Sequence, residues 1–146
     1  MSQTCQNYHY LECGLPYVWL HNGVQLHETL DGTVASISDV TGLHRTLATH
    51  IARCNQITGR EFRFLRMELG MDTHVTAEVL NIASIDIHSW ENHNADVPES
   101  VAKELCRLYL ETSHDTMQLG LPFSIPKTPI ELEYSRAQGW QLLFPR

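Results

Sequence analysis

The sequence lacks several features, and each absence narrows the class of protein. No apolar run approaches the roughly 20 residues that a membrane-spanning helix needs. The first residues contain neither the basic stretch nor the apolar stretch typical of a secretion signal. The cysteines have no paired spacing that indicates a disulfide framework; they are Cys5, Cys13, Cys54 and Cys106. These absences favour a cytoplasmic protein with reduced thiols and no membrane partner.

Motifs of the common enzyme classes are also missing. The sequence contains no nucleophile elbow, phosphate-binding loop, metalloprotease motif or glycine-rich dinucleotide fingerprint. Cys5, His9 and Cys13 lie close along the chain, but no fourth ligand follows at the spacing of known zinc sites. We therefore expect a protein without catalytic activity, metal or other cofactor.

Basic residues are scarce. The chain has 10 Lys and Arg against 17 Asp and Glu, which gives a net charge of -7. No Lys or Arg occurs between Asp72 and Ala102. Because nucleic-acid-binding proteins usually present a basic face to the phosphates, this stretch is poorly suited to strong phosphate binding.

The first third of the chain predicts a β-meander. Residues 17–21, 24–30 and 33–38 resemble strands, and the dipeptides Asn22-Gly23 and Asp31-Gly32 between them are typical of type I′ turns. We predict three antiparallel strands, to which residues 1–16 could add another.

A helix is expected to follow the meander and to pack on it. Ser38 and Asp39 offer an N-cap for this helix. Apolar residues then recur at helical spacing, namely Leu43, Leu47, Ile51 and Cys54.

The middle of the chain, residues 58–112, predicts four helices. Thr58 and Glu61 fit a capping box at the start of the first, which Gly70 ends. Asp72 can cap the second, and Pro98 suits the first turn of the fourth. The first helix has an apolar side made of Phe62, Leu65 and Leu69, with Arg60, Arg63 and Arg66 toward the other side. The inward side of the fourth is expected to contain Val101, Ala102, Leu105, Leu108 and Tyr109.

The second and third of these helices, over residues 73–80 and about 84–92, form a predicted helix-turn-helix. Ala77 is small enough for a close helix crossing, and Asn81 tolerates the left-handed conformation of a tight turn. Ile82 follows as an apolar plug, and Ile87 and Trp90 then recur on one side of the next helix. Two short helices joined by a three- to four-residue turn are the expected unit.

The C-terminal residues, 113–146, are predicted to form an extended tail. Pro122, Pro126 and Pro129 preclude a regular helix there. Short strands are indicated at residues 130–134 and 140–144, and they could pair with the N-terminal sheet or with a second subunit. The predicted division is therefore 1–57, 58–112 and 113–146, in an α+β fold with N-terminal strands followed by helices.

The middle segment resembles the Cro/repressor-type helix-turn-helix proteins, also called the XRE family, whose DNA-binding domain is all-helical and lambda-repressor-like. The resemblance is carried by residues 61–69, 76–82 and 87–92, and the pair Trp90-Glu91 is a fairly specific mark. Residues 13–23 and 42–44 also resemble small bacterial proteins that join such a domain to a β-rich N-terminal region. Some relatives of that design are autoregulators or antitoxins, so the resemblance implies a dimeric DNA-binding transcriptional regulator and makes a toxin a candidate protein partner.

In this family the first residues of the second helix and the exposed side of the third meet DNA. The candidate DNA-contacting residues are Arg63, Arg66, Thr73, His74, Ser84, Ile85, Asp86, His88, Ser89, Asn92 and Asn94. Thr73 stands where the family often has Gln, Ile85 and Asp86 stand where it has Gln and Thr, and Ser89 stands where Arg is frequent. These departures remove groups that usually contact bases and phosphates.

Two functions therefore stay open. The first is sequence-specific binding of double-stranded DNA by a homodimer on a two-fold site. The second is a degenerate helix-turn-helix that serves as a protein-interaction or dimerisation module without binding DNA. His74, His88 and His93 could add positive charge near DNA below about pH 6.5, or they could simply be exposed polar residues.

Overall fold

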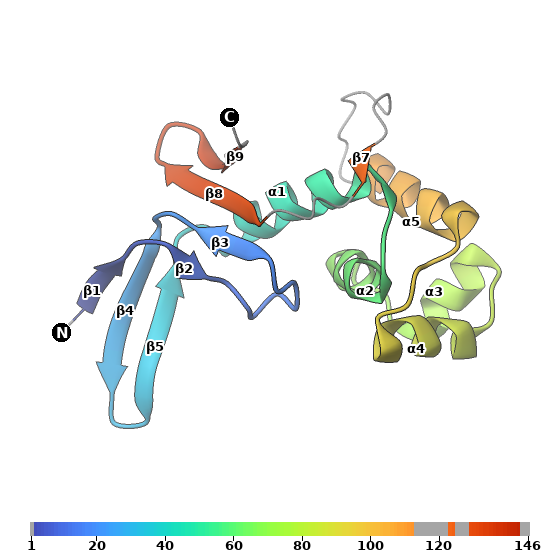
Figure 1. The fold of residues 1–146 in the computed structure, drawn as a ribbon, viewed down its shortest axis with the longest axis horizontal. Coiled ribbons are helices and arrows are strands. Elements are labelled where there is room, and N and C mark those ends of the chain that lie inside the picture. Colours follow the sequence, from blue (N-terminus) through green and yellow to red (C-terminus); the bar gives the residue numbers. More distant parts are fainter. Residues whose placement is uncertain (1, 113–122, 125–128, 144–146) are drawn as a thin grey trace. The chain divides into compact units, whose positions relative to one another are not determined.

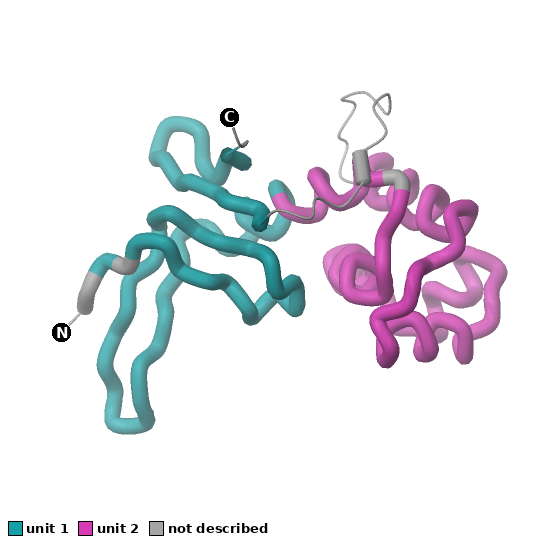
Figure 2. The backbone as a smooth tube through the Cα atoms, in the orientation of Figure 1, with its two compact units in different colours: residues 1–46, 127–146 teal, residues 47–126 magenta. Residues whose placement is uncertain are grey.

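A computed structural model describes residues 2–112, 123–124 and 129–143. The chain forms two compact units, one made of residues 1–46 and 127–146 and the other of residues 47–126 (Figure 2). Strands at the N-terminus are followed by helices, which confirms the α+β class (Figure 1). The division differs from the predicted one, because the boundary falls inside a helix and the C-terminal strands belong to the first unit.

The first unit contains a three-stranded antiparallel sheet, whose strands in spatial order are β1 (Ser2–Cys5), β4 (Val24–Thr29) and β5 (Gly32–Ile37). The predicted hairpin of β4 and β5 is confirmed, but its turn lies one residue earlier than expected. Thr29 pairs with Gly32, so Leu30 and Asp31 form the loop. Gly32 has a φ of 123°, whereas neither loop residue is among those with positive φ, so the turn is not type I′.

The same unit contains a second sheet, with the order β2 (Tyr8–His9), β3 (Val18–Leu20), β8 (Ile130–Ser135) and β9 (Gly139–Leu143). The predicted meander is wrong at its first strand, because β3 pairs with β2 and β8 and not with β4. The side chain of Asn22 explains this outcome. Its Nδ2 donates to the carbonyl oxygen of Tyr134 (2.9 Å) and its Oδ1 accepts from the Tyr134 amide (2.6 Å), so it ties the chain after β3 to β8. One alternative for the C-terminal strands, pairing with the N-terminal sheet, is confirmed.

Helix α1 (Val40–Ala52) begins at Asp39, whose Oδ1 accepts a hydrogen bond from the Gly42 amide (3.1 Å). A Cβ at Gly42 would lie 2.1 Å from the Asp39 carboxylate, so a larger residue there would make the capping side chain shift. The expected packing on the first unit occurs at the start of the helix, where the Tyr10 hydroxyl lies 2.7 Å from Nε2 of His44. Leu43, Leu47 and Ile51 are buried as predicted, but Cys54 lies beyond the helix in β6 (Cys54–Gln56).

The second unit is built from α2 (Gly59–Glu68), α3 (Thr73–Leu80), α4 (Ser84–His93) and α5 (Glu99–Thr112), with β6 paired in parallel to β7 (Phe123–Ser124). Its fully buried core includes Phe62, Leu65, Ile87 and Leu105. Burial raises the pKa of the Cys54 thiol to about 12, with a smaller contribution from Glu61. Burial likewise raises the pKa of Cys106 to about 12, so both thiols stay protonated at neutral pH.

The buried side of α5 differs in part from the predicted one. The buried side of α5 is centred on Ala102, Leu105 and Tyr109, whereas Val101 and Leu108 are only half-buried. The cause is the burial of Cys106 and Leu110, which turns the helix slightly from the predicted orientation. Most of the predicted proline-containing extended segment, residues 113–122 and 125–128, lies outside the described residues.

Candidate nucleic-acid interface

Helices α3 and α4 form the predicted helix-turn-helix. Asp72 begins α3, because its Oδ1 accepts a hydrogen bond from the Val75 amide (2.7 Å). Asn81 ends α3 in the left-handed conformation, with φ 56° and ψ 51°. The Ile82 amide then donates to the carbonyl oxygen of Ala77 (2.9 Å), which satisfies an acceptor at the helix end. The chain reverses within three residues before α4 begins.

The inner side of α4 packs against α2. Ile87 is fully buried, and Trp90 meets Phe62 edge-on with ring centroids 5.7 Å apart. At the start of α2, a Cβ on Gly59 would lie 1.9 Å from the carbonyl oxygen of Trp90, so the two backbones approach closely where only glycine fits. The capping box at this end is formed through Glu61, whose carboxylate accepts from the Thr58 amide (2.8 Å) and the Thr58 hydroxyl (2.7 Å).

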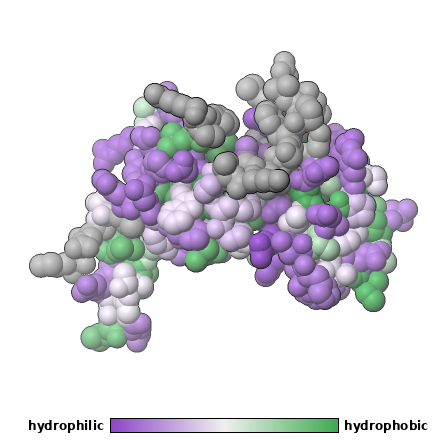
Figure 3. Space-filling model, viewed as in Figure 1, coloured by the Kyte–Doolittle hydropathy of each residue, from purple (hydrophilic) through white to green (hydrophobic). Residues whose placement is uncertain are grey.

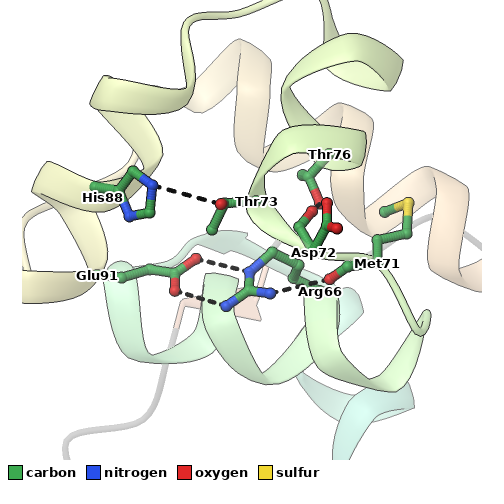
Figure 4. Close-up of polar contacts among 7 residues, drawn as sticks. All are labelled: Arg66, Met71, Asp72, Thr73, Thr76, His88 and Glu91. Atoms are coloured by element: carbon green, nitrogen blue, oxygen red, sulfur yellow. Dashed lines mark hydrogen bonds and ion pairs between the residues drawn. The ribbon is translucent and has the colours of Figure 1, made fainter.

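An ion pair between α2 and α4 fixes the orientation of α4. Nε and Nη2 of Arg66 each donate to a carboxylate oxygen of Glu91 at 2.9 Å, and Nη1 donates to the carbonyl oxygen of Met71, also at 2.9 Å (Figure 4). The side chains of Arg66 and Glu91 are only 12% and 9% exposed. The guanidinium of Arg66 is therefore turned inward, with Nε, Nη1 and Nη2 each bonded within the fold, and this orientation does not favour the predicted phosphate contact.

Asn94 also has a role within the fold. It ends α4 in the left-handed conformation (φ 46°), and its Oδ1 accepts a hydrogen bond from the Arg60 amide in the first turn of α2 (3.0 Å). The side-chain oxygen of Asn94 is therefore already bonded within the fold, which does not favour its predicted contact with DNA. Thr73, at the start of α3, is half-buried with its hydroxyl 3.4 Å from Nε2 of His88 (Figure 4).

The remaining predicted contact residues include a group that lies together on the outer side of α4. Ile85 is 73% exposed, which is unusual for an isoleucine in a helix that buries its other side. The other exposed residues of this group are Asp86, His88, Ser89 and Asn92, and Ser84 is half-buried at the helix start. His74 is exposed on α3 and Arg63 on α2. The structure thus brings five predicted residues together on one helix.

The charge around this surface is acidic. Asp86 lies in the first turn of α4, and Glu78 is exposed on α3 with its Oε1 3.4 Å from Nε2 of His74. Two exposed arginines, Arg60 and Arg63, lie on α2. Arg60 is bonded through its amide to the end of α4, and Arg66, two turns later, bonds to Glu91. These two bonds place α2 alongside the C-terminal half of α4.

Sequence reasoning missed two exposed apolar residues beside this surface. Val75 and Val79, four residues apart on α3, are 41% and 52% exposed. Ile85 on α4 is a third exposed apolar side chain of the helix-turn-helix, and Figure 3 shows some apolar surface on the second unit. The four-residue spacing of Val75 and Val79 is the signal that could have identified them, because it places both on one side of α3, away from Thr76 and Ala77, which are buried.

Within residues 2–112, 123–124 and 129–143, no cluster of three or more His, Cys, Asp or Glu is arranged to hold a metal ion. None of the helices in the described part of the chain has the length and apolar character needed to span a membrane. Comparison of the chain with protein-family models, with curated proteins and with solved structures found no match.

Proposed function

We propose that this protein is a cytoplasmic transcriptional regulator of the Cro/repressor type that binds double-stranded DNA through α4, as a homodimer on a two-fold site. One observation carries the proposal. Helix α4 is held by its inner side through Ile87 and Glu91, while five polar or apolar side chains on its outer side remain exposed. The major groove of B-DNA accepts an α-helix, and a helix-turn-helix presents its second helix in this way.

The exposed side chains of α4 have the chemistry to read base edges. Asn92 can pair bidentately with adenine, and Ser89 can donate or accept a hydrogen bond. Asp86 can accept from the N4 amino group of cytosine, and Ile85 can contact a thymine methyl group. Base contacts therefore supply the sequence preference of this surface, and nonspecific attraction to the phosphates adds little to its affinity.

Phosphate binding rests on few residues. Arg66 is engaged with Glu91, which leaves Arg60 and Arg63 as the exposed arginines of α2. Two phosphate contacts per protomer correspond to a slope of log affinity against log salt of about -2 per protomer, or about -4 for a dimer. Nonspecific affinity is correspondingly low, so the proposed regulator depends on its specific site.

The test starts from the purified full-length chain. A binding site is selected from a random double-stranded library, with DNA from upstream of its own gene as a second source, and affinity is measured by fluorescence anisotropy at several salt concentrations. We expect specific binding with the shallow slope given above. A folded protein that binds neither DNA source at low salt would sink the proposal.

Variants separate base contacts from phosphate contacts. Asn92→Ala should lower affinity for the selected site by about tenfold or more, with little effect on unrelated DNA. Arg63→Ala should weaken binding to every sequence and reduce the salt slope by about one unit per protomer. Arg107→Ala, at an exposed arginine on α5, is the matched control and should change neither value.

A second candidate function is a protein-interaction module that keeps the helix-turn-helix without binding DNA. The exposed Val75, Val79 and Ile85 favour it, because they lie in a segment whose charged residues include Glu78 and Asp86 but no Lys or Arg. A toxin-like partner would need apolar side chains flanked by basic ones. On this alternative, Val79→Lys abolishes partner binding and the anisotropy titration shows no DNA complex.

A further inference from the structure

Strand β5 forms an edge of the three-stranded sheet. Among the described strands, only β4 pairs with it. Alternate residues of an edge strand direct their amide and carbonyl groups away from the sheet, where they can pair with another strand. This edge is six residues long, from Gly32 to Ile37.

The sequence of this strand lacks the residue types that usually prevent pairing. Residues 32–38 contain no charged residue and no proline, and Asp31 and Asp39 lie just outside the two ends. Natural edge strands are commonly protected by Lys, Pro or a covering element. Val34, in the middle, is 52% exposed, and Leu30 in the adjoining loop is fully exposed. The strand therefore offers apolar contact as well as backbone pairing.

The net charge of the chain favours some surfaces over others for contact between two copies. The chain has a net charge of -7, so copies of it repel each other unless they meet at an uncharged surface. Association through Val75 and Val79 would bring each Glu78 toward the acidic helix of another copy. Pairing through β5 brings no charged side chain into the strand itself. In an antiparallel pair centred on Val34, Asp31 lies opposite the partner subunit's Ile37.

We propose that β5 pairs antiparallel with β5 of a second copy of this chain, forming a continuous six-stranded sheet across a two-fold axis. Such an interface is isologous and closes at two subunits. The two Val34 side chains lie opposite each other at its centre, as in other cross-strand apolar pairs. The inference gives the dimer of the proposed function its contact surface, but its test needs no DNA.

The test measures the mass of the full-length chain in solution by sedimentation equilibrium across micromolar concentrations. We expect a species of twice the 16.7 kDa chain mass. Val34→Lys should raise the dimer dissociation constant by about tenfold or more, because two ammonium groups then face each other. Val79→Lys is the matched control, since Val79 is also 52% exposed, and it should leave the dissociation constant unchanged.

A second variant gives a positive signal that does not depend on weakening the dimer. Under mild oxidation, Val34→Cys should form a cross-linked dimer, and Val79→Cys should not. A wild-type chain that stays monomeric overturns the inference, as does a dimer that Val34→Lys leaves intact. An open series of larger oligomers also overturns it, because that result indicates head-to-tail pairing with β1. A monomeric chain would also remove the homodimer from the proposed function, whereas binding of DNA by α4 is decided separately by the anisotropy titration.

Discussion

The guanidinium of Arg66 and the carboxylate of Glu91 meet through two parallel hydrogen bonds of 2.9 Å, although the residues are 25 positions apart. Arg66 lies on α2 and Glu91 on α4, and both side chains are nearly buried. A bidentate pair restricts both distance and orientation. The ion pair therefore sets which side of α4 faces solvent, and hence which residues are offered to a ligand.

Breaking this pair should be costly. Glu91→Gln leaves the buried guanidinium without a counter-charge, and removal of one partner of such a pair costs about 3 kcal/mol or more. Urea denaturation followed by circular dichroism measures the loss in the free energy of unfolding. Arg107→Ala, which breaks exposed ion pairs on α5, should lower the free energy of unfolding far less than Glu91→Gln does. Equal losses in the two variants would contradict the structural role of Glu91.

A second prediction concerns stability and follows from the left-handed conformation of Asn81. Asn81→Val should lower the free energy of unfolding by about 1–2 kcal/mol, because a β-branched residue is disfavoured at a φ of 56°. Asn81→Gly should be neutral or slightly stabilising. Asn92→Val provides the control, since it makes the same exchange within a helix, where Asn and Val have similar propensities. Thermal melts of the three variants check this order.

Local signals explain which parts of the fold the sequence predicted. The capping residues Asp72 and Asn81 and the box of Thr58 and Glu61 act within four residues, so their patterns identify the helix ends directly. Sheet partners are different. The dipeptide Asn22-Gly23 can occur in a hairpin turn or in a connection between two sheets, and the sequence does not distinguish the two. Tyr134, the hydrogen-bond partner of Asn22, is 112 residues away. Periodicity carries no information about such a pairing.

The candidate site was predictable to a similar extent. Ile85, Ser89 and Asn92 were placed on one exposed side because helical spacing determines which residues share a side. The roles of Arg66 and Asn94 were not predictable, because an arginine that binds phosphate and one that binds a buried carboxylate look alike in sequence. Only the position of Glu91 on the adjoining helix distinguishes the two.

The stability of the protein should depend on pH through His50. Burial, and to a smaller extent the nearby Arg53 charge, lowers the pKa of His50 below its ordinary value of 6.5. As pH falls below about 6.5 the unfolded chain therefore binds a proton that the folded chain refuses, and stability is lost until the folded-state pKa is passed. In His50→Gln, the decrease in urea midpoint between neutral and mildly acidic pH should be smaller. His74→Gln, at an exposed histidine, should retain the full decrease.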